Sequence, residues 1–251
     1  MKKVIISLLL ITGGIFTSCE DTSSENVSNL TVYPVITLEG DDPAFVEAGT
    51  PYTDPGATGT ISGVPVDLDT QFIGRYRKNV FSELDTNVAD VYNLEYSAMN
   101  SDGFTSGASR QVIVAKTGDL VNSIEGLYTS TVTRNGAQGS PASAYTDIEY
   151  ILIWKNADGT YEVSDAFGGW YLFARAIGGS ESPGGKIVAN SIPGNSFTFP
   201  GTFSNSYFGG SARITALTVD PATKKLVLTC VWQADAATTY TFVSTLTQVQ
   251  F

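Results

Sequence analysis

The chain has 251 residues, with 14 lysines and arginines against 25 aspartates and glutamates, and it contains no histidine. The acidic balance argues against nucleic acid as a partner, because phosphate contacts require Lys and Arg. The absence of histidine excludes Ser-His-Asp and Cys-His catalysis and His-ligated zinc, and with Cys19 committed to lipid the one remaining cysteine cannot form a thiolate zinc site within the chain. We therefore expect no cofactor, while carboxylate chemistry and oxygen-ligated calcium stay open.

The N-terminus has the parts of a secretory signal. Lys2 and Lys3 form a basic start, residues 4–16 are almost wholly apolar, and small residues precede Cys19. This order is typical of an export signal, and the apolar run is shorter than the roughly 20 residues that a membrane-spanning helix needs. We predict a signal peptide over residues 1–18, whose removal would take away both lysines and make the chain still more acidic.

The sequence Phe-Thr-Ser-Cys at residues 16–19 resembles a lipobox, with Phe16 in place of the usual leucine. The resemblance implies that Cys19 becomes the first residue of the mature chain and carries acyl lipid such as palmitate. Two or more acyl chains anchor a protein stably, whereas one chain binds only weakly. Residues 19–31 are rich in Ser, Thr, Asn and acids, which predicts a flexible tether. The acids directly after Cys19 resemble the surface-export signals of Bacteroidetes lipoproteins, which implies the outer membrane, with its outer face preferred.

Residues 32–117 show short strands separated by Gly, Pro and Asp turns. Residues 32–38 read as an edge strand, because they contain a proline that a central strand would not accommodate. Residues 91–100 alternate apolar and polar side chains and lead into a Ser-Asp-Gly turn, and residues 111–115 end the unit. The acids at the turns offer only a weak calcium signal, and they are Asp41, Asp42, Asp54 and Asp102.

Two motifs in this region resemble a bacterial immunoglobulin-like domain of surface proteins. They are E-x-G-x-x-Y-x-D-P-G-A at residues 47–57 and a Y-x-L-x-Y strand leading to the S-D-G turn at residues 92–103. The resemblance covers about 85 residues and implies a β-sandwich that acts as a spacer or adhesive module. Tyr92 lies where a tyrosine corner would bond its hydroxyl back to the chain, and an ordinary strand tyrosine is the alternative.

Residues 116–119, Lys-Thr-Gly-Asp, form the candidate joint between two domains. The acidic excess lies before the joint, with 15 acids and 5 bases in residues 20–118 against 10 acids and 7 bases in residues 119–251. We therefore predict that residues 32–117 and 119–251 fold as separate domains.

Residues 119–251 also read as strands without a helix. Asp158-Gly159 is a hairpin signal, and residues 220–224 predict a second hairpin. The predicted fold class is all-β, with an immunoglobulin-like sandwich followed by a second antiparallel sandwich or barrel-like domain. The whole chain resembles Bacteroidetes surface lipoproteins of uncharacterised function that join these two units. Their usual setting implies glycan handling beside outer-membrane uptake proteins.

Two clusters in the second domain place aromatic rings beside paired glycines, at residues 165–171 and 206–211. Aromatic faces can stack on sugar rings, and a few polar groups can orient the ligand. We predict that Trp170 is the main stacking platform, Tyr207 a second wall, Tyr171 a hydroxyl donor and Asp165 an acceptor of sugar hydroxyls. The alternative is that the rings are core and the glycines form turns or bulges.

Other notable side chains read as structural. Trp154 and Trp232 lie in apolar strand-like runs and are expected in the core, and Cys230 is expected to be a small buried hydrophobe.

Three functions compete. The first is a glycan-binding lipoprotein of polysaccharide capture or uptake, and the second is a structural or adhesive protein that binds other proteins. The third is a glycoside hydrolase, which needs two carboxylates roughly 5–10 Å apart. Its candidate acids are Asp147, Glu149, Glu162 and Asp165. Acids on hairpins are mostly solvated, so we expect binding rather than an enzyme.

Overall fold

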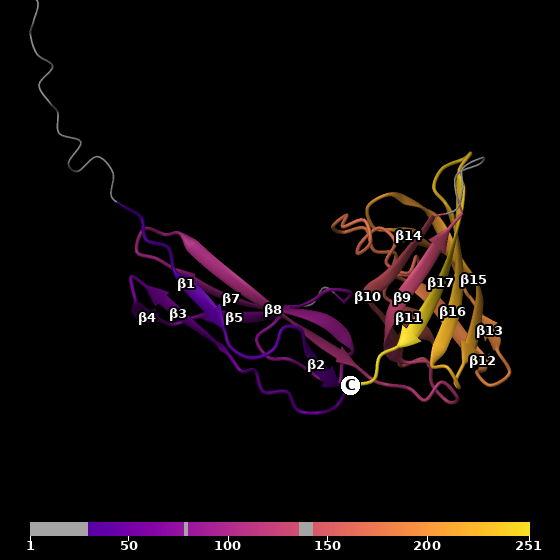
Figure 1. The fold of residues 1–251 in the computed structure, drawn as a ribbon, viewed down its shortest axis with the longest axis horizontal. Coiled ribbons are helices and arrows are strands. Elements are labelled where there is room, and N and C mark those ends of the chain that lie inside the picture. The colour runs from indigo at the N-terminus through magenta and orange to yellow at the C-terminus, as the bar shows by residue number, and fades with distance from the viewer. Residues whose placement is uncertain (1–29, 78–79, 136–142) are drawn as a thin grey trace, which may run out of the picture.

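The computed structural model describes residues 30–77, 80–135 and 143–251 (Figure 1). These residues form seventeen strands and no helix, which confirms the predicted all-β class. The predicted signal peptide, Cys19 and most of the predicted tether lie outside the described residues. Within the described ranges, no helix could cross a membrane.

The first domain is a sandwich of two sheets. The three-stranded sheet has the order β1-β3-β4, formed by β1 (Val35–Leu38), β3 (Ala57–Ile61) and β4 (Val64–Val66). The five-stranded sheet has the order β2-β8-β7-β5-β6, formed by β2 (Ala44–Glu47), β8 (Thr105–Ala115), β7 (Asp90–Met99), β5 (Asp69–Gly74) and β6 (Val80–Phe81). The predicted edge strand is β1, which pairs with β3 alone. The proline at position 34 lies just before it, where no ladder bond is lost.

The immunoglobulin-like motifs have a structural explanation in this sandwich. Asp54, from D-P-G-A, forms an ion pair with Arg110 of β8 at 2.8 Å and accepts the hydroxyl of Tyr96 from β7 at 2.6 Å. The Arg110 side chain is fully buried and also donates to the carbonyl of Gly56. Because a buried charge must be paired, these contacts hold the D-P-G-A loop against the five-stranded sheet. The carboxylate suggested for calcium at Asp54 is therefore engaged by protein groups.

Each domain contains a tyrosine corner, in which a tyrosine hydroxyl donates to a backbone carbonyl four residues upstream. The Tyr92 hydroxyl donates to the carbonyl of Val88 at 2.8 Å, which confirms the tyrosine-corner interpretation. In the second domain, the Tyr128 hydroxyl donates in the same way to Ile124, four residues upstream, at 2.7 Å. This second corner was not predicted from the sequence.

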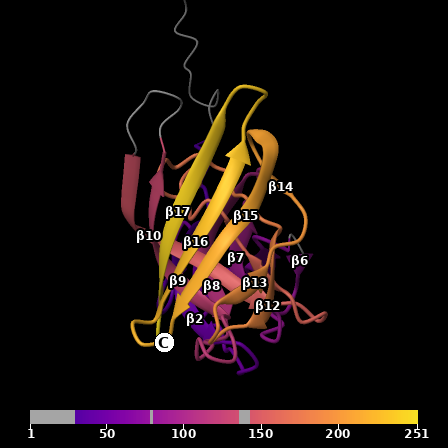
Figure 2. The ribbon, with the colours of Figure 1, turned by 90° about the vertical axis from the view of Figure 1, so that its right-hand side faces the viewer.

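The second domain is one antiparallel sheet of nine strands in the order β13-β12-β11-β10-β9-β17-β16-β15-β14 (Figures 1 and 2). Its central strands are β9 (Gly126–Arg134), β10 (Ser143–Lys155), β17 (Thr239–Gln248) and β16 (Lys225–Gln233). The outer strands are β11 (Tyr161–Val163), β12 (Gly185–Ser191), β13 (Ser196–Thr198), β15 (Gly209–Asp220) and β14 (Phe203–Asn205). Both predicted hairpins are present, as β10–β11 and β15–β16.

The nine-stranded sheet curls so that its two halves face each other. Gly185 of β12 lies so close to Ile214 of β15 that a side chain at Gly185 would overlap it. The segment between β11 and β12, residues 164–184, packs inside the curl and contributes Phe167 and Trp170 to the core. The domain is therefore barrel-like, with its own chain filling the interior.

The two domains meet through an apolar junction. Its buried members are Val91, Ile113 and Ala115 from the first domain and Leu127, Leu152 and Trp154 from the second. Tyr76 of the first domain stacks on Trp154 with ring centroids 6.2 Å apart. Trp154 is therefore buried as expected, but between the domains and outside the main core of the second domain.

Candidate functional site

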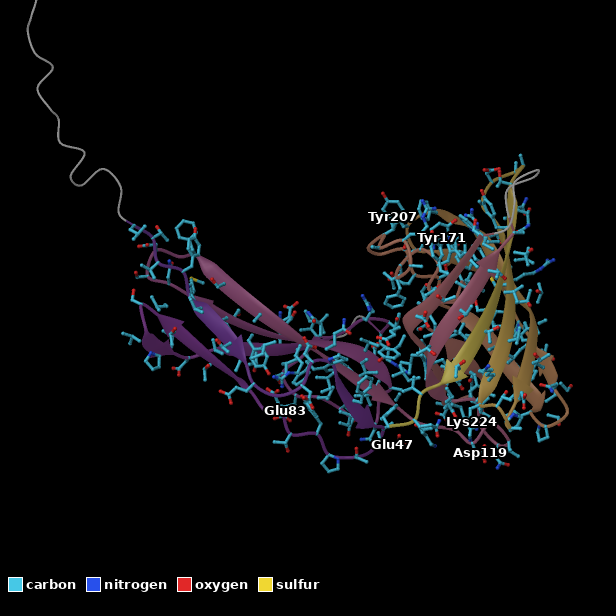
Figure 3. The ribbon with its side chains drawn as sticks, viewed as in Figure 1. Glu47, Glu83, Asp119, Tyr171, Tyr207 and Lys224 are labelled. Carbon is cyan, nitrogen blue, oxygen red and sulfur yellow. The ribbon has the colours of Figure 1, made fainter. Side chains whose placement is uncertain are left out.

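The two aromatic–glycine clusters meet at one end of the second domain. Figure 3 shows Tyr171 and Tyr207 close together there, while Asp119 and Lys224 lie at the opposite end. The ring centroids of Tyr171 and Phe208 are 4.9 Å apart, and those of Phe208 and Tyr207 are also 4.9 Å apart. The fold thus brings together two segments that are distant in sequence, as the saccharide hypothesis requires.

Tyr207 and Phe208 form the exposed part of this end, with 65% and 42% of their surface accessible. The buried side chain of Asn205 fixes their backbone, because its Oδ1 accepts the N–H groups of Tyr207 at 3.1 Å and Phe208 at 2.8 Å. Its Nδ2 donates to the carbonyl of Ser180 at 2.6 Å and to the hydroxyl of Ser182 at 2.9 Å. The exposed rings therefore stand on a backbone tied to the core.

Paired glycines shape the loop beneath these rings. Gly209 and Gly210 both have positive φ, and the carbonyl of Gly209 accepts the indole N–H of Trp232 at 3.0 Å. A side chain at Gly210 would overlap that indole. The Gly-Gly pair is thus a tight turn against a core tryptophan, and Trp232 is core as expected.

Trp170 does not have the exposed face that the predicted stacking role requires. It is 2% exposed, with Tyr145 edge-on to it at 4.6 Å and Phe242 against it at 5.9 Å. The structure therefore corrects the assignment of Trp170 as the main platform. Gly168 and Gly169, both at positive φ, let this segment turn into the interior of the sheet.

Asp165 is also a core residue, with 1% of its surface exposed. Its Oδ1 accepts the N–H of Phe167 at 2.9 Å, and its Oδ2 has no partner among the described residues. Burial raises the pKa of this carboxyl to about 7. The expectation that Asp165 accepts sugar hydroxyls is corrected for the same reason, since no ligand at the surface can reach it.

Arg134 is a part of this end that the sequence analysis did not identify. Its guanidinium lies between the rings of Trp170 at 4.9 Å and Tyr240 at 4.4 Å, and it donates to the Tyr171 hydroxyl at 3.2 Å. The Tyr171 ring is almost fully buried, and burial raises the pKa of its hydroxyl. Cations over aromatic faces are stabilised by the ring quadrupole. We call Arg134, Tyr145, Tyr171, Tyr207, Phe208 and Tyr240 the aromatic rim.

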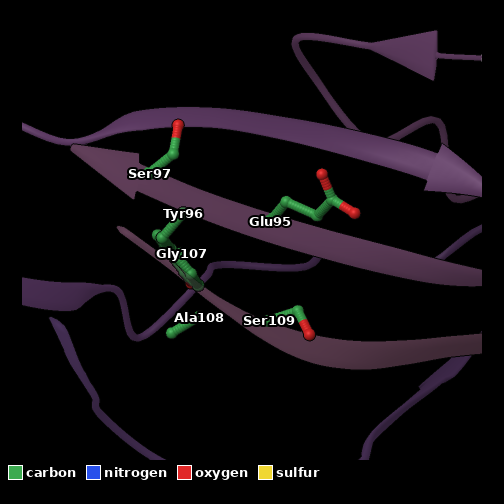
Figure 4. A pocket seen from close by; sticks show the side chains of 6 residues that line it. All are labelled: Glu95, Tyr96, Ser97, Gly107, Ala108 and Ser109. Carbon is green, nitrogen blue, oxygen red and sulfur yellow. The ribbon is translucent and has the colours of Figure 1, made fainter. Parts of the chain in front are cut away.

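A separate shallow hollow of about 280 Å³ lies on the five-stranded sheet of the first domain (Figure 4). It is bordered by Glu95, Ser97 and Ser109, and Gly107, which has no side chain, also lines it. Glu95 already accepts hydrogen bonds from the amides of Gln71 and Asn93. The hollow thus offers few free polar groups, which leaves the aromatic rim as the better candidate.

The burial of Asp165 also bears on the other sequence hypotheses. It removes one acid from the proposed hydrolase set, and Glu162 accepts a hydrogen bond from Asn156 at 3.4 Å. Within the described ranges, no group of three or more acidic, cysteine or histidine side chains is placed to hold a metal ion. Cys230 is buried, as expected for a small hydrophobe, and burial raises the pKa of its thiol.

Comparisons with known proteins place both halves of the chain. A family model for a C-terminal domain matches residues 117–248, which is more than half of the sequence, and a model for the Ig-like domain of bacterial surface proteins matches residues 36–114. The crystal structure of the lipoprotein BT2262 from Bacteroides thetaiotaomicron is similar, with a TM-score of 0.62 and 25% identity over 86% of this chain and 100% of that one. No curated protein matches the chain.

Proposed function

This chain belongs to the family that the C-terminal-domain model describes, and from that premise we propose that it is a lipid-anchored surface protein that binds glycan. Its first domain is an Ig-like domain of bacterial surface proteins, and its structural relative is a Bacteroides lipoprotein. Both findings indicate a surface-associated lipoprotein. Beyond these findings we propose three things: that Cys19 carries lipid, that the protein is located in the outer membrane, and that its ligand is a glycan.

The observation that carries the proposal is the pair of exposed rings on a fixed backbone. Tyr207 and Phe208 are accessible, and Asn205 holds their N–H groups in place. A fixed backbone reduces the conformational entropy that the segment loses when a ligand stacks on its rings. Tyr207 and Phe208 therefore take over the stacking role first assigned to Trp170.

Polar groups beside the rings could orient a sugar. Tyr171 and Arg134 form a hydrogen-bonded pair just below Phe208, and Arg175 lies over the Tyr171 ring at 5.8 Å. Each hydrogen bond would add only about 1 kcal/mol net, because water competes for the same groups. We expect weak affinity at a single site, strengthened by avidity when many copies on one cell engage a polymer.

The proposal is tested with the chain from Glu20 to Phe251 on a glycan array, followed by calorimetry with any glycan that it binds. Tyr207→Ala and Phe208→Ala are expected to weaken binding at least tenfold while thermal unfolding stays unchanged. Tyr33→Ala is the matched control, because it removes another exposed tyrosine, 52% accessible, from the first domain. Equal affinity in all three variants, or loss in Tyr33→Ala alone, would contradict the aromatic rim as the site.

Adhesion to another protein is the second candidate, and one observation favours it. Tyr33 and Phe104 form an exposed aromatic pair at 5.5 Å in the first domain, and Met99 is also exposed. Exposed apolar groups that lie together are typical of protein contacts. A chain that binds no glycan, but loses a protein partner when Tyr33 or Phe104 is replaced, would support this function instead. We propose binding in either case and assign no catalytic step.

A further inference from the structure

We propose that a cationic hollow at the domain junction is a second binding site, for a ligand whose charged group is a carboxylate or a sulfate, as in a uronic acid or a sulfated sugar. The hollow has a volume of about 300 Å³ and is lined by both domains. Its side chains include Arg77, Asn87 and Lys116 from the first domain and Glu125, Trp154 and Lys155 from the second. We call it the junction hollow.

The charge of the junction hollow is opposite to that of the chain. The sequence has 14 lysines and arginines against 25 acids, and two of those lysines are in the predicted signal peptide. Three of the remaining cations line this single hollow, against one carboxylate. Such a concentration in an acidic protein creates a local positive potential that attracts anions.

The cations Arg77 and Lys155 are exposed, and the ammonium of Lys155 lies over the Tyr161 ring at 5.6 Å. Lys116 lies 3.7 Å from Glu125, but Arg77 and Lys155 form no ion pair with any carboxylate in the ranges that the structure describes. The guanidinium of Arg77 lies over the Trp154 ring at 5.4 Å, and its Nε donates to the carbonyl of Ala89 at 3.2 Å. Its terminal N–H groups form a planar fork that matches a carboxylate or sulfate.

The backbone that carries Arg77 is fixed from inside the first domain. The buried carboxyl of Asp90 accepts the N–H groups of Tyr76 and Arg77, each at 3.0 Å. Tyr76 in turn stacks on Trp154 across the junction. The backbone of Arg77 is thus held where the two domains meet, and an anion bound in the junction hollow would contact both domains.

The test uses the three tryptophans of the chain as reporters. The indole N–H of Trp154 donates to Asn156 at 3.1 Å and lies beside Arg77, whereas Trp170 and Trp232 are in the second-domain core. In a ¹⁵N NMR spectrum of residues 20–251, Trp154→Phe assigns its indole signal. Sodium glucuronate and sodium sulfate are then titrated, with sodium chloride at equal ionic strength and neutral glucose as controls.

We expect a saturable shift of the Trp154 signal with glucuronate, with sulfate or with both, and the stronger anion identifies the charged group. The double variant Arg77→Gln/Lys155→Gln should weaken the apparent affinity at least tenfold, while unchanged Trp170 and Trp232 signals show that it is folded. Lys224→Gln/Lys225→Gln, at the β15–β16 turn, removes the same charge and should bind like the wild type.

A shift that does not saturate, or that chloride reproduces, would overturn the proposal, as would equal weakening in both double variants. Because Tyr207 belongs to the aromatic rim and not to the junction hollow, Tyr207→Ala should leave the Trp154 titration unchanged. Failure of the aromatic rim and failure of the junction hollow are therefore distinguishable.

Discussion

Asp165 gives the second domain a pH-dependent stability that can be measured directly. Its carboxyl is buried, one oxygen accepts the N–H of Phe167, and the other has no partner among the described residues. Burial raises its pKa from 3.8 to about 7, and the nearby charge of Glu181 adds to the shift. The perturbation is Asp165→Asn, which keeps the shape and one acceptor oxygen but cannot ionise.

The sign follows from proton linkage. Between pH 4 and pH 7 the unfolded chain has lost the Asp165 proton while the folded chain still holds it. Unfolding therefore releases a proton, so the free energy of unfolding falls as pH rises through this window. The two pKa values differ by about 3 units at 1.36 kcal/mol each, so the loss is on the order of 4 kcal/mol. Asp165→Asn should be free of this loss.

The assay is urea unfolding of wild type and Asp165→Asn at pH 4, 5.5 and 7, with the difference taken at each pH so that other carboxyls cancel. The variant should gain stability relative to wild type at each step. Asp235→Asn is the control: the N–H of Ala237 and other turn donors lower the pKa of Asp235 below 3.8, so its difference from wild type should stay nearly constant from pH 4 to pH 7. Its carboxylate contributes stability that is lost as pH falls through its folded pKa. A difference for Asp165→Asn that stays constant across this range would refute the reasoning.

Four further predictions follow from particular contacts. Trp154→Ala should cost about 3–5 kcal/mol by leaving a cavity at the junction, and calorimetry should show the two domains unfolding in separate transitions, where we expect one for the wild type. Residues 119–251 alone should still unfold cooperatively, because their main core is separate from the junction, and circular dichroism melting checks this. Gly168→Ala should lower the melting temperature far more than Gly159→Ala, because an added Cβ overlaps a buried serine only at Gly168. Cys19→Ala should move the protein from the membrane to the soluble fraction, and full retention on the membrane would contradict lipid anchoring.

The sequence predicted best where the determinants of structure are local. Gly and Asp at the turns, together with alternating apolar residues, located the β7–β8, β10–β11 and β15–β16 hairpins. The tyrosine corner of Tyr92 could also be predicted from the sequence, because the carbonyl that accepts its hydroxyl is only four residues upstream. In contrast, the buried ion pair of Arg110 with Asp54 joins residues far apart in sequence, and nothing near Arg110 indicated that it would be buried.

The candidate site was harder to predict, because exposure at the end of a curled sheet depends on the whole fold. Trp170 and Tyr207 both lie beside paired glycines, yet one is enclosed by Tyr145 and Phe242 while the other is open to solvent. Local sequence cannot separate these outcomes, since glycine permits both an inward turn and a surface turn. Arg134 was missed because its aromatic partners come from other parts of the chain.

The junction connects the spacer and binding hypotheses. In Figure 1 the described chain begins at the end of the first domain that points away from the second domain. A lipid on Cys19 would therefore place the Ig-like domain between the membrane and the aromatic rim. A flexible joint would let the second domain fold back toward the membrane, whereas stacking of Tyr76 on Trp154 and the buried residues around them oppose such movement. In the proposed function the Ig-like domain would hold the rim away from the cell surface and would contact a ligand only at the junction hollow.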